Sequence, residues 1–312
     1  MPETSRASIL VLGGININLI ATADSIPLPG ETVTGDLFYT TPGGKGANQA
    51  VAAARMGARV QMVGRVGRDA FGPGLIEDLR TEGIDVSAVA EDAGAASGVA
   101  VILLDGERQN YIVQVRGANL AAGEAEVAAV VEALGAADAL MLQLEMPFDV
   151  SLRAAEAARR AGVPVIWDPA PPSPDMERAI DLVDVIAPNQ SEAQFLTGIE
   201  VTGPGTAEAA AHMLLDRGVP TVVIKMAETG AYYATAKESG LVPAFRVDVV
   251  DSVAAGDAFG GALAVSIAEG RNLRQAVERG CAAGALAVTR PGAQAAMPSR
   301  QEVERLVSTL GS

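Results

Sequence analysis

The sequence predicts an α/β fold: a doubly wound, mostly parallel β-sheet with helices on both faces and a small β-sheet lid. Three observations predict it. From about residue 121 onward, short apolar runs alternate with helical stretches, which is typical of a parallel sheet. Two β-rich inserts, near residues 15–40 and 97–117, interrupt the earlier part of the chain and are suited to form the lid. The length of 312 residues allows one large α/β domain or two small ones, and because no domain linker is recognisable we expect a single domain over residues 1–312.

In the first half of the chain, the residue pattern predicts a buried strand, a second strand, two helices and a hairpin. Residues 9–12 form an apolar run that ends in two glycines, as expected of a buried first strand. A second strand is expected over residues 60–64, with helices over residues 47–56 and 72–82. Alternation over residues 98–116, with Asp105-Gly106 as turn residues, predicts a β-hairpin.

The second half of the chain repeats strand and helix. Helices are expected over residues 123–134, 149–161, 175–181 and 206–217, and strands over residues 139–142, 163–167, 183–186 and 221–225. Ligands bind beyond the carboxyl ends of the strands in such sheets. Polar residues follow four successive strands there: Glu145, Asp168, Asn189 with Glu192, and Lys225. Each alone could be a cap or a surface charge, but their shared position favours a ligand site.

Composition excludes several classes of function. The formal charge of −15 argues against nucleic acid or an anionic membrane as a partner, so a phosphate ligand would need locally placed donors. Cys281 is the only cysteine, so an internal disulfide is impossible. His212 is the only histidine and falls within an Ala-rich helical stretch, so we expect proton transfer to use a carboxylate. We expect a cytoplasmic protein, because no apolar run is long enough to span a bilayer.

Asp251 and Asp257 flank a run of tiny side chains, and an apolar helical pattern begins at Asp257. Uncovered backbone N–H groups at the start of a helix form a site for an anion, above all for phosphate. An Asp facing that site could take a proton from a nucleophile that attacks a phosphoryl group. The alternative is an Asp that only caps the helix, and these residues alone leave both interpretations open.

A second glycine-rich stretch, residues 41–50, leads into a helix of small residues. It lacks the P-loop spacing, but its glycines let a ligand approach the backbone, with Lys45 and Asn48 as polar contacts. A plain turn before a tightly packed helix is the alternative. Asn16 and Asn18 fall on one side of an extended segment, where their amides either bind hydroxyl groups or cap a strand end.

These two glycine stretches resemble the two signatures of the ribokinase, or PfkB-type carbohydrate kinase, family. Residues 29–35, 142–145 and 288–290 are similar to the family as well. The resemblance covers about residues 8–300. It implies transfer of the γ-phosphoryl group of ATP to a sugar hydroxyl with the help of Mg²⁺, with D-ribose as the first candidate acceptor and ribose 5-phosphate as its product. It also implies a homodimer formed through the lid.

The resemblance implies a role for each matching residue. Asp257 would be the general base and Ala254, Ala255 and Gly256 the anion hole. The sugar site would comprise Asn16, Asn18, Gly44, Lys45, Gly46, Asn48 and Glu145. The nucleotide and Mg²⁺ side would comprise Asn189, Glu192, Lys225, Ala227, Gly230, Gly256 and Cys281. A monovalent cation, K⁺, would lie on Asp251, Val253, Ala287, Arg290 and Gly292.

Some residues depart from the family pattern. Asn18 replaces an Asp that grips sugar hydroxyls, Lys225 and Ala227 alter the nucleotide segment, and Ala296 replaces a Ser near the cation. A nucleoside kinase, or a kinase of another pentose or of a ketose, is therefore an alternative. A sugar-binding protein without turnover is a third, although a pure binder would not need the base Asp257.

Overall fold

The computed structural model describes residues 6–107 and 109–311. The main sheet has the order β13-β12-β11-β10-β9-β8-β1-β4-β5. Its strands are β1 (Ser8–Leu12), β4 (Arg59–Gly67), β5 (Asp85–Asp92), β8 (Ala139–Leu142), β9 (Val165–Trp167), β10 (Val185–Ile186), β11 (Thr221–Lys225), β12 (Ala231–Thr235) and β13 (Ser239–Val242). Strands β5 through β11 of this order pair in parallel, and β12 and β13 pair antiparallel. The predicted mostly parallel sheet is therefore confirmed.

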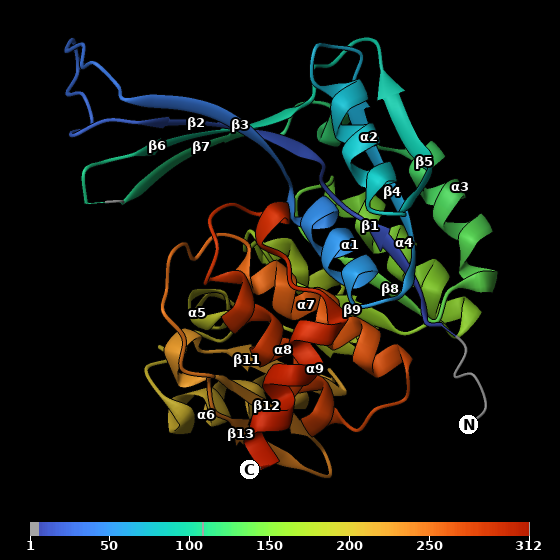
Figure 1. The fold of residues 1–312 in the computed structure, drawn as a ribbon. Coiled ribbons are helices and arrows are strands. Elements are labelled where there is room, and N and C mark those ends of the chain that lie inside the picture. Colours follow the sequence, from blue (N-terminus) through green and yellow to red (C-terminus); the bar gives the residue numbers. More distant parts are fainter. Residues whose placement is uncertain (1–5, 108, 312) are drawn as a thin grey trace.

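Helices cover both faces of this sheet (Figure 1). One layer holds α1 (Lys45–Arg55), α2 (Gly72–Thr81), α7 (Ala255–Ala268), α8 (Leu273–Ala287) and α9 (Arg300–Val307). The other holds α3 (Glu124–Ala133), α4 (Phe148–Ala161), α5 (Gln190–Thr197) and α6 (Pro204–Asp216). Strand β1 explains the two layers, because Ile9 and Val11 join one core cluster while Leu10 and Leu12 join the other.

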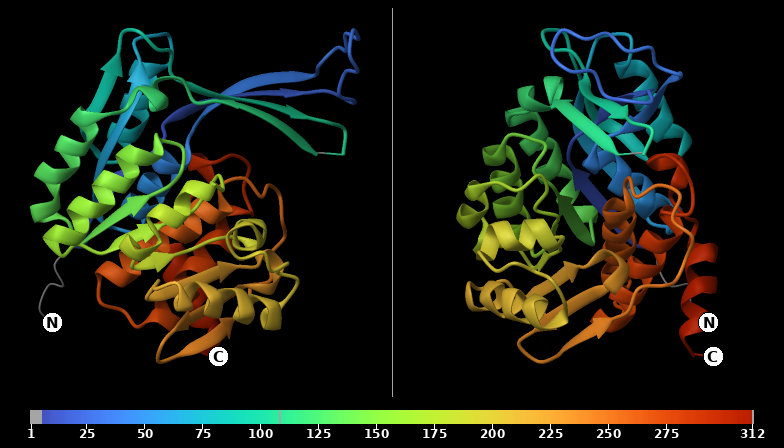
Figure 2. Two further views of the ribbon diagram at one scale, coloured as in Figure 1. Left: turned by 180° about the vertical axis from the view of Figure 1, so that it is seen from behind. Right: turned by 90° about the vertical axis from the view of Figure 1, so that its left-hand side faces the viewer.

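The two inserts pair into a second sheet of order β3-β2-β6-β7. Its strands are β2 (Asn16–Thr22), β3 (Leu37–Gly43), β6 (Gly98–Leu104) and β7 (Asn110–Val115). The inserts meet where β2 pairs in parallel with β6, and β6 and β7 form the expected hairpin. This four-stranded sheet, the arm, extends from the body of the molecule (Figures 1 and 2). Its action as a lid stays a prediction.

Several elements differ from the expectations. The α-helix expected over 175–181 is absent, and two short 3₁₀ helices, η3 (Pro174–Arg178) and η4 (Ile180–Leu182), take its place. Strands β5, β12 and β13 and helices α5, α8 and α9 were not predicted. In β12 four successive residues are buried, so the strand lacks alternation. Among the described residues, no helix is long and apolar enough to cross a membrane.

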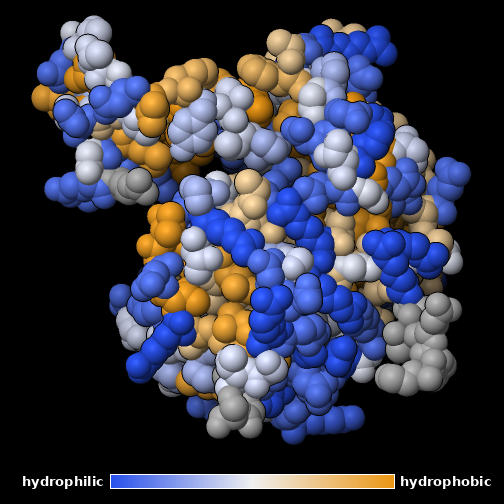
Figure 3. Space-filling view, in the orientation of Figure 1, coloured by the Kyte–Doolittle hydropathy of each residue, from blue (hydrophilic) through white to orange (hydrophobic). Residues whose placement is uncertain are grey.

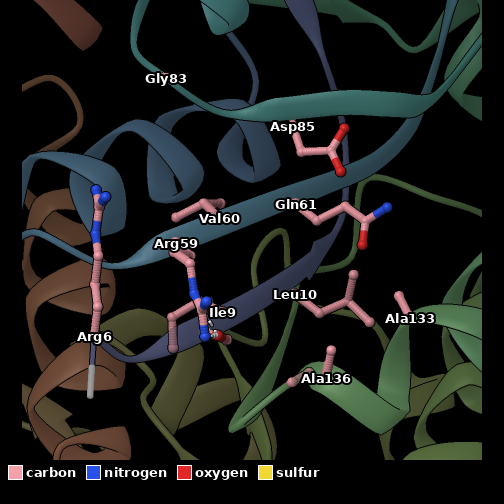
Figure 4. Close-up of a pocket in the computed structure, with 12 residues that line it drawn as sticks. Arg6, Ile9, Leu10, Arg59, Val60, Gln61, Gly83, Asp85, Ala133 and Ala136 are labelled. Atoms are coloured by element: carbon pink, nitrogen blue, oxygen red, sulfur yellow. Dashed lines mark hydrogen bonds between the residues drawn. The ribbon is translucent and has the colours of Figure 1, made fainter.

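A cavity of about 430 Å³ opens at the amino ends of the strands (Figure 4). Ser8, Arg59 and Asp85, the first residues of β1, β4 and β5, contribute to its lining. Ligand sites of doubly wound sheets lie at the opposite, carboxyl ends. The polar residues predicted from the sequence gather at that other end, and they are described next.

Candidate active site

The amino terminus of α7 leaves backbone N–H groups uncovered at the place where the sequence predicts an anion hole. Its N-cap residue, Ala254, has left-handed backbone angles of φ 60° and ψ 10°, and the first strong helical bond runs from Ala258 N–H to the Ala254 carbonyl at 2.9 Å. The N–H groups of Gly256 and Asp257 lie before that bond and point beyond the helix end. A Cβ built on Gly256 would lie 3.6 Å from Lys225 Nζ, so an ammonium group stands beside these donors. Backbone dipoles and one positive charge thus converge on one point.

Asp257 lies in the first turn of α7 and is 5% exposed. Two amides of α1 donate to its carboxylate: Asn48 Nδ2 to Oδ2 at 2.9 Å and Gln49 Nε2 to Oδ1 at 3.1 Å. Burial raises the pKa of Asp257; Lys45 opposes this rise and Asp168 adds to it. A carboxylate with a raised pKa is a better proton acceptor than an ordinary Asp.

A buried polar network extends behind Asp257. Gln49 Nε2 also donates to Asp168 Oδ2 at 2.9 Å, and Lys225 Nζ donates to Asp168 Oδ1 at 3.0 Å. Gln143 Nε2 donates to Gln49 Oε1 at 2.6 Å. Asp168 follows β9 and Lys225 ends β11, so two of the polar residues expected at successive strand ends do come together. Gln143, which follows β8, was not among the expected residues.

Glu145 is the centre of a second group of polar residues. Its Oε2 accepts a bond from the backbone N–H of Lys45 at 2.6 Å, and its Oε1 accepts bonds from Gln114 Nε2 at 2.6 Å and Asn16 Nδ2 at 3.5 Å. Burial raises the pKa of Glu145, and Lys45 opposes the rise. Burial alone would lower the pKa of Lys45, but the surrounding carboxylates, led by Asp257, raise it above the ordinary value, so Lys45 is protonated at neutral pH.

Asn18 belongs to a row of residues that crosses the arm. The strand register places Thr41, Asn18, Ala100 and Gln114 opposite one another on β3, β2, β6 and β7. Asn18 Nδ2 donates to Thr41 Oγ1 at 3.3 Å. A Cβ on Gly43 would lie 2.6 Å from the Asn18 amide, so this glycine makes room for it. The row connects the arm to Glu145 through Gln114.

Glycines allow α1 to approach the turn between β1 and β2. Gly44 has φ 91°, and a Cβ there would lie 2.5 Å from the Gly14 carbonyl oxygen. A Cβ on Gly46 would lie 2.6 Å from Gly13 Cα. Backbone packing therefore accounts for these glycines, as the tight-packing alternative expected. The same packing places Lys45 and Asn48 among the carboxylates described above.

Residues 6–300 match the model of the pfkB family of carbohydrate kinases. The chain belongs to this family. A ribokinase of Haemophilus influenzae is 36% identical over 95% of this chain and 97% of its own, and a deoxyribokinase of Salmonella typhi is 33% identical over 96% and 98%. The solved ribokinase of Arabidopsis thaliana, complexed with ribose and ATP, is 30% identical over 97% of this chain and 99% of its own, with a TM-score of 0.89. The protein is thus a carbohydrate kinase of ribokinase type.

In this pfkB-family kinase, Asn189 and Glu192 form the capping box of α5. Asn189 Oδ1 accepts from Glu192 N–H at 2.9 Å, and both Glu192 oxygens accept bonds from Asn189, at 2.7 and 2.8 Å. A β-bridge joins Asn189 to Lys225, so the capping box lies beside the lysine that stands next to the amino terminus of α7. Burial, and then Asp168, raise the pKa of Glu192.

In the segment after β11, Ala227 adopts a positive φ of the kind that usually requires a glycine. Ala227 has φ 46°, and Ala227 and Ala254 are the positive-φ residues other than glycine in the described chain. Such angles cost an alanine about 1 kcal/mol or more, and the surrounding structure must hold them. Gly230 has φ 107°, and a Cβ there would lie 2.0 Å from the Val242 carbonyl oxygen. The kinase therefore holds strained alanine backbone at two positions, Ala227 just after β11 and Ala254 at the start of α7.

Cys281 and His212 lie outside the polar networks. Cys281 is buried in α8, where burial and then Glu278 raise its thiol pKa to about 12, so it is not a thiolate nucleophile at neutral pH. His212 is exposed on α6 near Glu208, as expected of a surface histidine.

Asp251 links the α7 loop to the end of α8. Its Oδ1 accepts from Val253 N–H at 3.0 Å and its Oδ2 from Gly292 N–H at 2.9 Å, so three of the residues expected around a monovalent cation are joined. Arg290 N–H donates to the Ala287 carbonyl at 3.3 Å. Within residues 6–107 and 109–311, His, Cys, Asp and Glu form no group of three or more that could hold a metal.

The sequence-based interpretation missed four amides that organise the site: Gln49, Gln143, Gln114 and Asn119. Asn119 donates to Asn16 Oδ1 at 2.8 Å and accepts from Ile15 N–H at 2.9 Å, so it orients Asn16. Gln49 directly follows Asn48 in the glycine-rich stretch, and Gln143 follows a buried strand, so both had a recognisable position. Gln114 lies in an exposed strand and carried no signal.

Proposed function

We propose that this kinase transfers the γ-phosphoryl group of ATP to a hydroxyl of D-ribose and forms ribose 5-phosphate. The observation that carries the proposal is the position of Asp257 in the first turn of α7, buried, held by two amides and next to uncovered backbone donors. A base at the mouth of an anion hole suits attack of a hydroxyl on a phosphoryl group.

In the proposed reaction Asp257 accepts the proton of the acceptor hydroxyl as its oxygen attacks the γ-phosphorus. The bond to the β-phosphate oxygen breaks, and ADP leaves. The backbone of residues 254–257, with the uncovered N–H groups of Gly256 and Asp257, holds the charge of the transferred group together with the ammonium of Lys225. Mg²⁺, bound by the nucleotide phosphates on the side of Asn189 and Glu192, would neutralise phosphate charge.

The sugar would lie between Asp257 and Glu145, against Asn16, Asn18, Lys45 and Asn48. Asn48 Oδ1 is buried and has no hydrogen-bond partner within the described chain, which fits a hydroxyl donor from a ligand. The ribokinase relatives, one of them complexed with ribose and ATP, support ribose as the acceptor. The deoxyribokinase relative makes 2-deoxyribose the natural comparison.

The test is ADP release from purified kinase, Mg²⁺ and ATP over a panel of ribose, 2-deoxyribose, arabinose, xylose, fructose, adenosine and inosine. We expect the highest kcat/KM for ribose, with a phosphate on O5 of the product by ³¹P and ¹³C NMR. A higher kcat/KM for a nucleoside would overturn the assignment of ribose, and no turnover on any acceptor would favour a sugar-binding protein.

The proposed K⁺ site uses the Asp251 carboxylate with carbonyl oxygens near Val253, Ala287, Arg290 and Gly292. Asp251 keeps lone pairs free beyond its two backbone bonds, which fits a monovalent cation. Ala296 is fully buried and brings no side-chain oxygen, so carbonyls must complete the site. We expect turnover to be higher in K⁺ than in tetramethylammonium. Equal rates in both salts would overturn the cation site.

The proposed homodimer pairs the arms of two copies. Figure 3 shows hydrophobic surface on the arm. The large apolar side chains that the arm exposes are Leu37, Phe38, Tyr39, Val101, Tyr111, Ile112, Val113 and Val115. Exposed edges and apolar faces of this kind favour association. Sedimentation velocity should give a dimer for the wild type and a monomer for Val113→Lys. A wild-type monomer at micromolar concentration would contradict the proposal.

A further inference from the structure

Gln49 binds two carboxylates with one nitrogen. Its Nε2 donates to Asp257 Oδ1 at 3.1 Å and to Asp168 Oδ2 at 2.9 Å. All three side chains are buried, and each carboxylate is about 5% exposed. An amide nitrogen has two hydrogens, so one Gln satisfies both acceptors. Two like charges that face a common donor in a buried site also interact strongly.

The orientation of Gln49 is determined by its surroundings. Carboxylates only accept hydrogen bonds when ionised, so the nitrogen must face them. On the other side of the amide, Gln143 Nε2 donates to Gln49 Oε1 at 2.6 Å. Gln143 is fully buried after β8 and therefore has little freedom to move.

Lys225 connects the network to the anion hole. Its ammonium bonds Asp168 Oδ1 at 3.0 Å and stands 3.6 Å from the position that a Gly256 Cβ would take. The connected groups are therefore the anion hole, Lys225, Asp168, Gln49 and Asp257, in that order. These residues lie on α1, α7, β11 and the segment after β9, so the tertiary fold alone assembles them.

We propose that Gln49 is a positioning residue that couples the Lys225–Asp168 ion pair to Asp257, so that an anionic phosphoryl group at Lys225 makes Asp257 a stronger base. The inference rests on the proposed function. A phosphoryl anion offsets the lysine charge, which leaves Asp168 less compensated. Asp168 then favours protonation of its neighbour Asp257 across Gln49. Proton transfer from the sugar hydroxyl is thereby promoted only when the nucleotide is in place.

Other charged groups also face this pair. Lys45 of α1 opposes protonation of Asp257, and Glu145 after β8 interacts with Asp257 through the same buried space. Glu192 of α5 lies within the field of Asp168, Lys225 and Lys45. These groups are unchanged in the variants below, so differences among those variants report the coupling through Gln49.

The first test needs no turnover. ¹³C NMR of the Asp257 carboxyl carbon, assigned with Asp257→Asn, gives its titration midpoint in the free enzyme. We expect Asp168→Asn to lower the midpoint, because a negative neighbour is lost, and Gln49→Leu to raise it, because a donor is lost. In the Gln49→Leu background the effect of Asp168→Asn should change in size. Additive effects in the double variant would overturn the coupling.

The second test uses AMP-PNP with Mg²⁺ as the phosphoryl probe, without sugar. The Asp257 midpoint should rise on binding in the wild type and rise less in Asp168→Asn. A rise of equal size in both proteins would show that the phosphate acts directly and would overturn the inference. Ser266→Ala, a buried change further along α7, is the control and should behave as the wild type.

The third test separates positioning from folding. Gln49→Leu should lower kcat on the order of 100-fold, with a smaller change in the sugar KM, and should move the acidic limb of the kcat/KM profile. Unfolding in urea verifies that the variant is folded. A lower kcat with an unmoved limb would assign Gln49 a packing role and overturn the coupling. If the wild type shows no turnover on any sugar, the proposed sugar kinase activity is refuted. The two NMR tests measure the coupling without turnover, so they would still decide the inference about Gln49.

Discussion

The two regions that form the site differ in how firmly they are held. In the core region, at the ends of the main strands, Gln49, Asp168 and Asp257 are at most 5% exposed and linked by direct bonds. In the arm, every residue of β7 is exposed. Among the described hydrogen bonds, Gln114 to Glu145 is the one from a β7 side chain to the body.

This difference matches two different tasks. Phosphoryl transfer depends on placing the base and the anion hole within a fraction of an ångström, which a densely bonded core provides. Admission of a sugar requires a part that opens, and few buried contacts mean a low cost of local opening. The arm therefore suits the lid predicted from the sequence, with Gln114 as its contact with Glu145 of the body.

The largest effect should follow from a change in the core region. Asp257→Asn keeps the shape of the side chain but removes the proton acceptor, so we expect kcat to fall about 1000-fold. Sugar binding, measured by isothermal titration calorimetry, should remain within a few-fold of the wild type. Asp149→Asn, an exposed change on α4, is the matched control. A variant that keeps a tenth of wild-type kcat would contradict the role of Asp257 as base.

The dependence of kcat/KM on pH should report the ionisation of Asp257. Burial raises the pKa of Asp257, and Asp168 adds to the rise. Because only the ionised form accepts a proton, kcat/KM should fall about tenfold per pH unit below that pKa. The limb should therefore lie at higher pH than for an ordinary Asp, and it should be absent from the residual activity of Asp257→Asn. A limb near the ordinary Asp value would mean that another group controls the rate.

The substitution Asp257→Asn, which should lower activity, should raise the free energy of unfolding at high pH. A carboxyl with a raised pKa in the folded state binds more protons folded than unfolded, so it lowers stability as pH rises from its unfolded toward its folded pKa. Asp257→Asn removes this cost. Urea unfolding should therefore give a higher free energy of unfolding for the variant than for the wild type at pH 8, with a smaller difference at pH 4. A less stable variant at pH 8 would contradict the raised pKa.

A change in the arm should act on binding more than on chemistry. Gln114→Leu removes the bond to the Glu145 carboxylate, worth about 1.5 kcal/mol or more for a charged acceptor, so the sugar KM should rise about tenfold. We expect kcat to change less. Gln109→Leu, at the tip of the same arm and bonded locally to Glu107, is the control. A large loss of kcat with an unchanged KM would place Gln114 with the chemistry rather than with the lid.

The sequence could predict the central parallel strands of the main sheet and the polar residues at their ends, because apolar periodicity and strand-end position are local properties, but it did not predict β5, β12 or β13. It could not predict that Gln49 bonds Asp168, 119 positions away, because that contact depends on how α1 packs over the sheet. The same holds for Gln114 and Glu145, which only the position of the arm brings together. Glycines 44 and 46 had a visible pattern, but only the structure shows that they pack on Gly13 and Gly14.

The smallest expected effect tests whether the arm reads the acceptor. The resemblance to the family implies an Asp at the position of Asn18, and a carboxylate binds hydroxyl donors about twice as strongly as an amide. Gly43 leaves room for the change, and Thr41 Oγ1 can donate to the new carboxylate. Asn18→Asp should therefore lower the KM for ribose a few-fold without moving the acidic limb set by Asp257. If the KM for ribose rises while that for another acceptor falls, the arm is tuned to that acceptor, and ribose is not the preferred substrate.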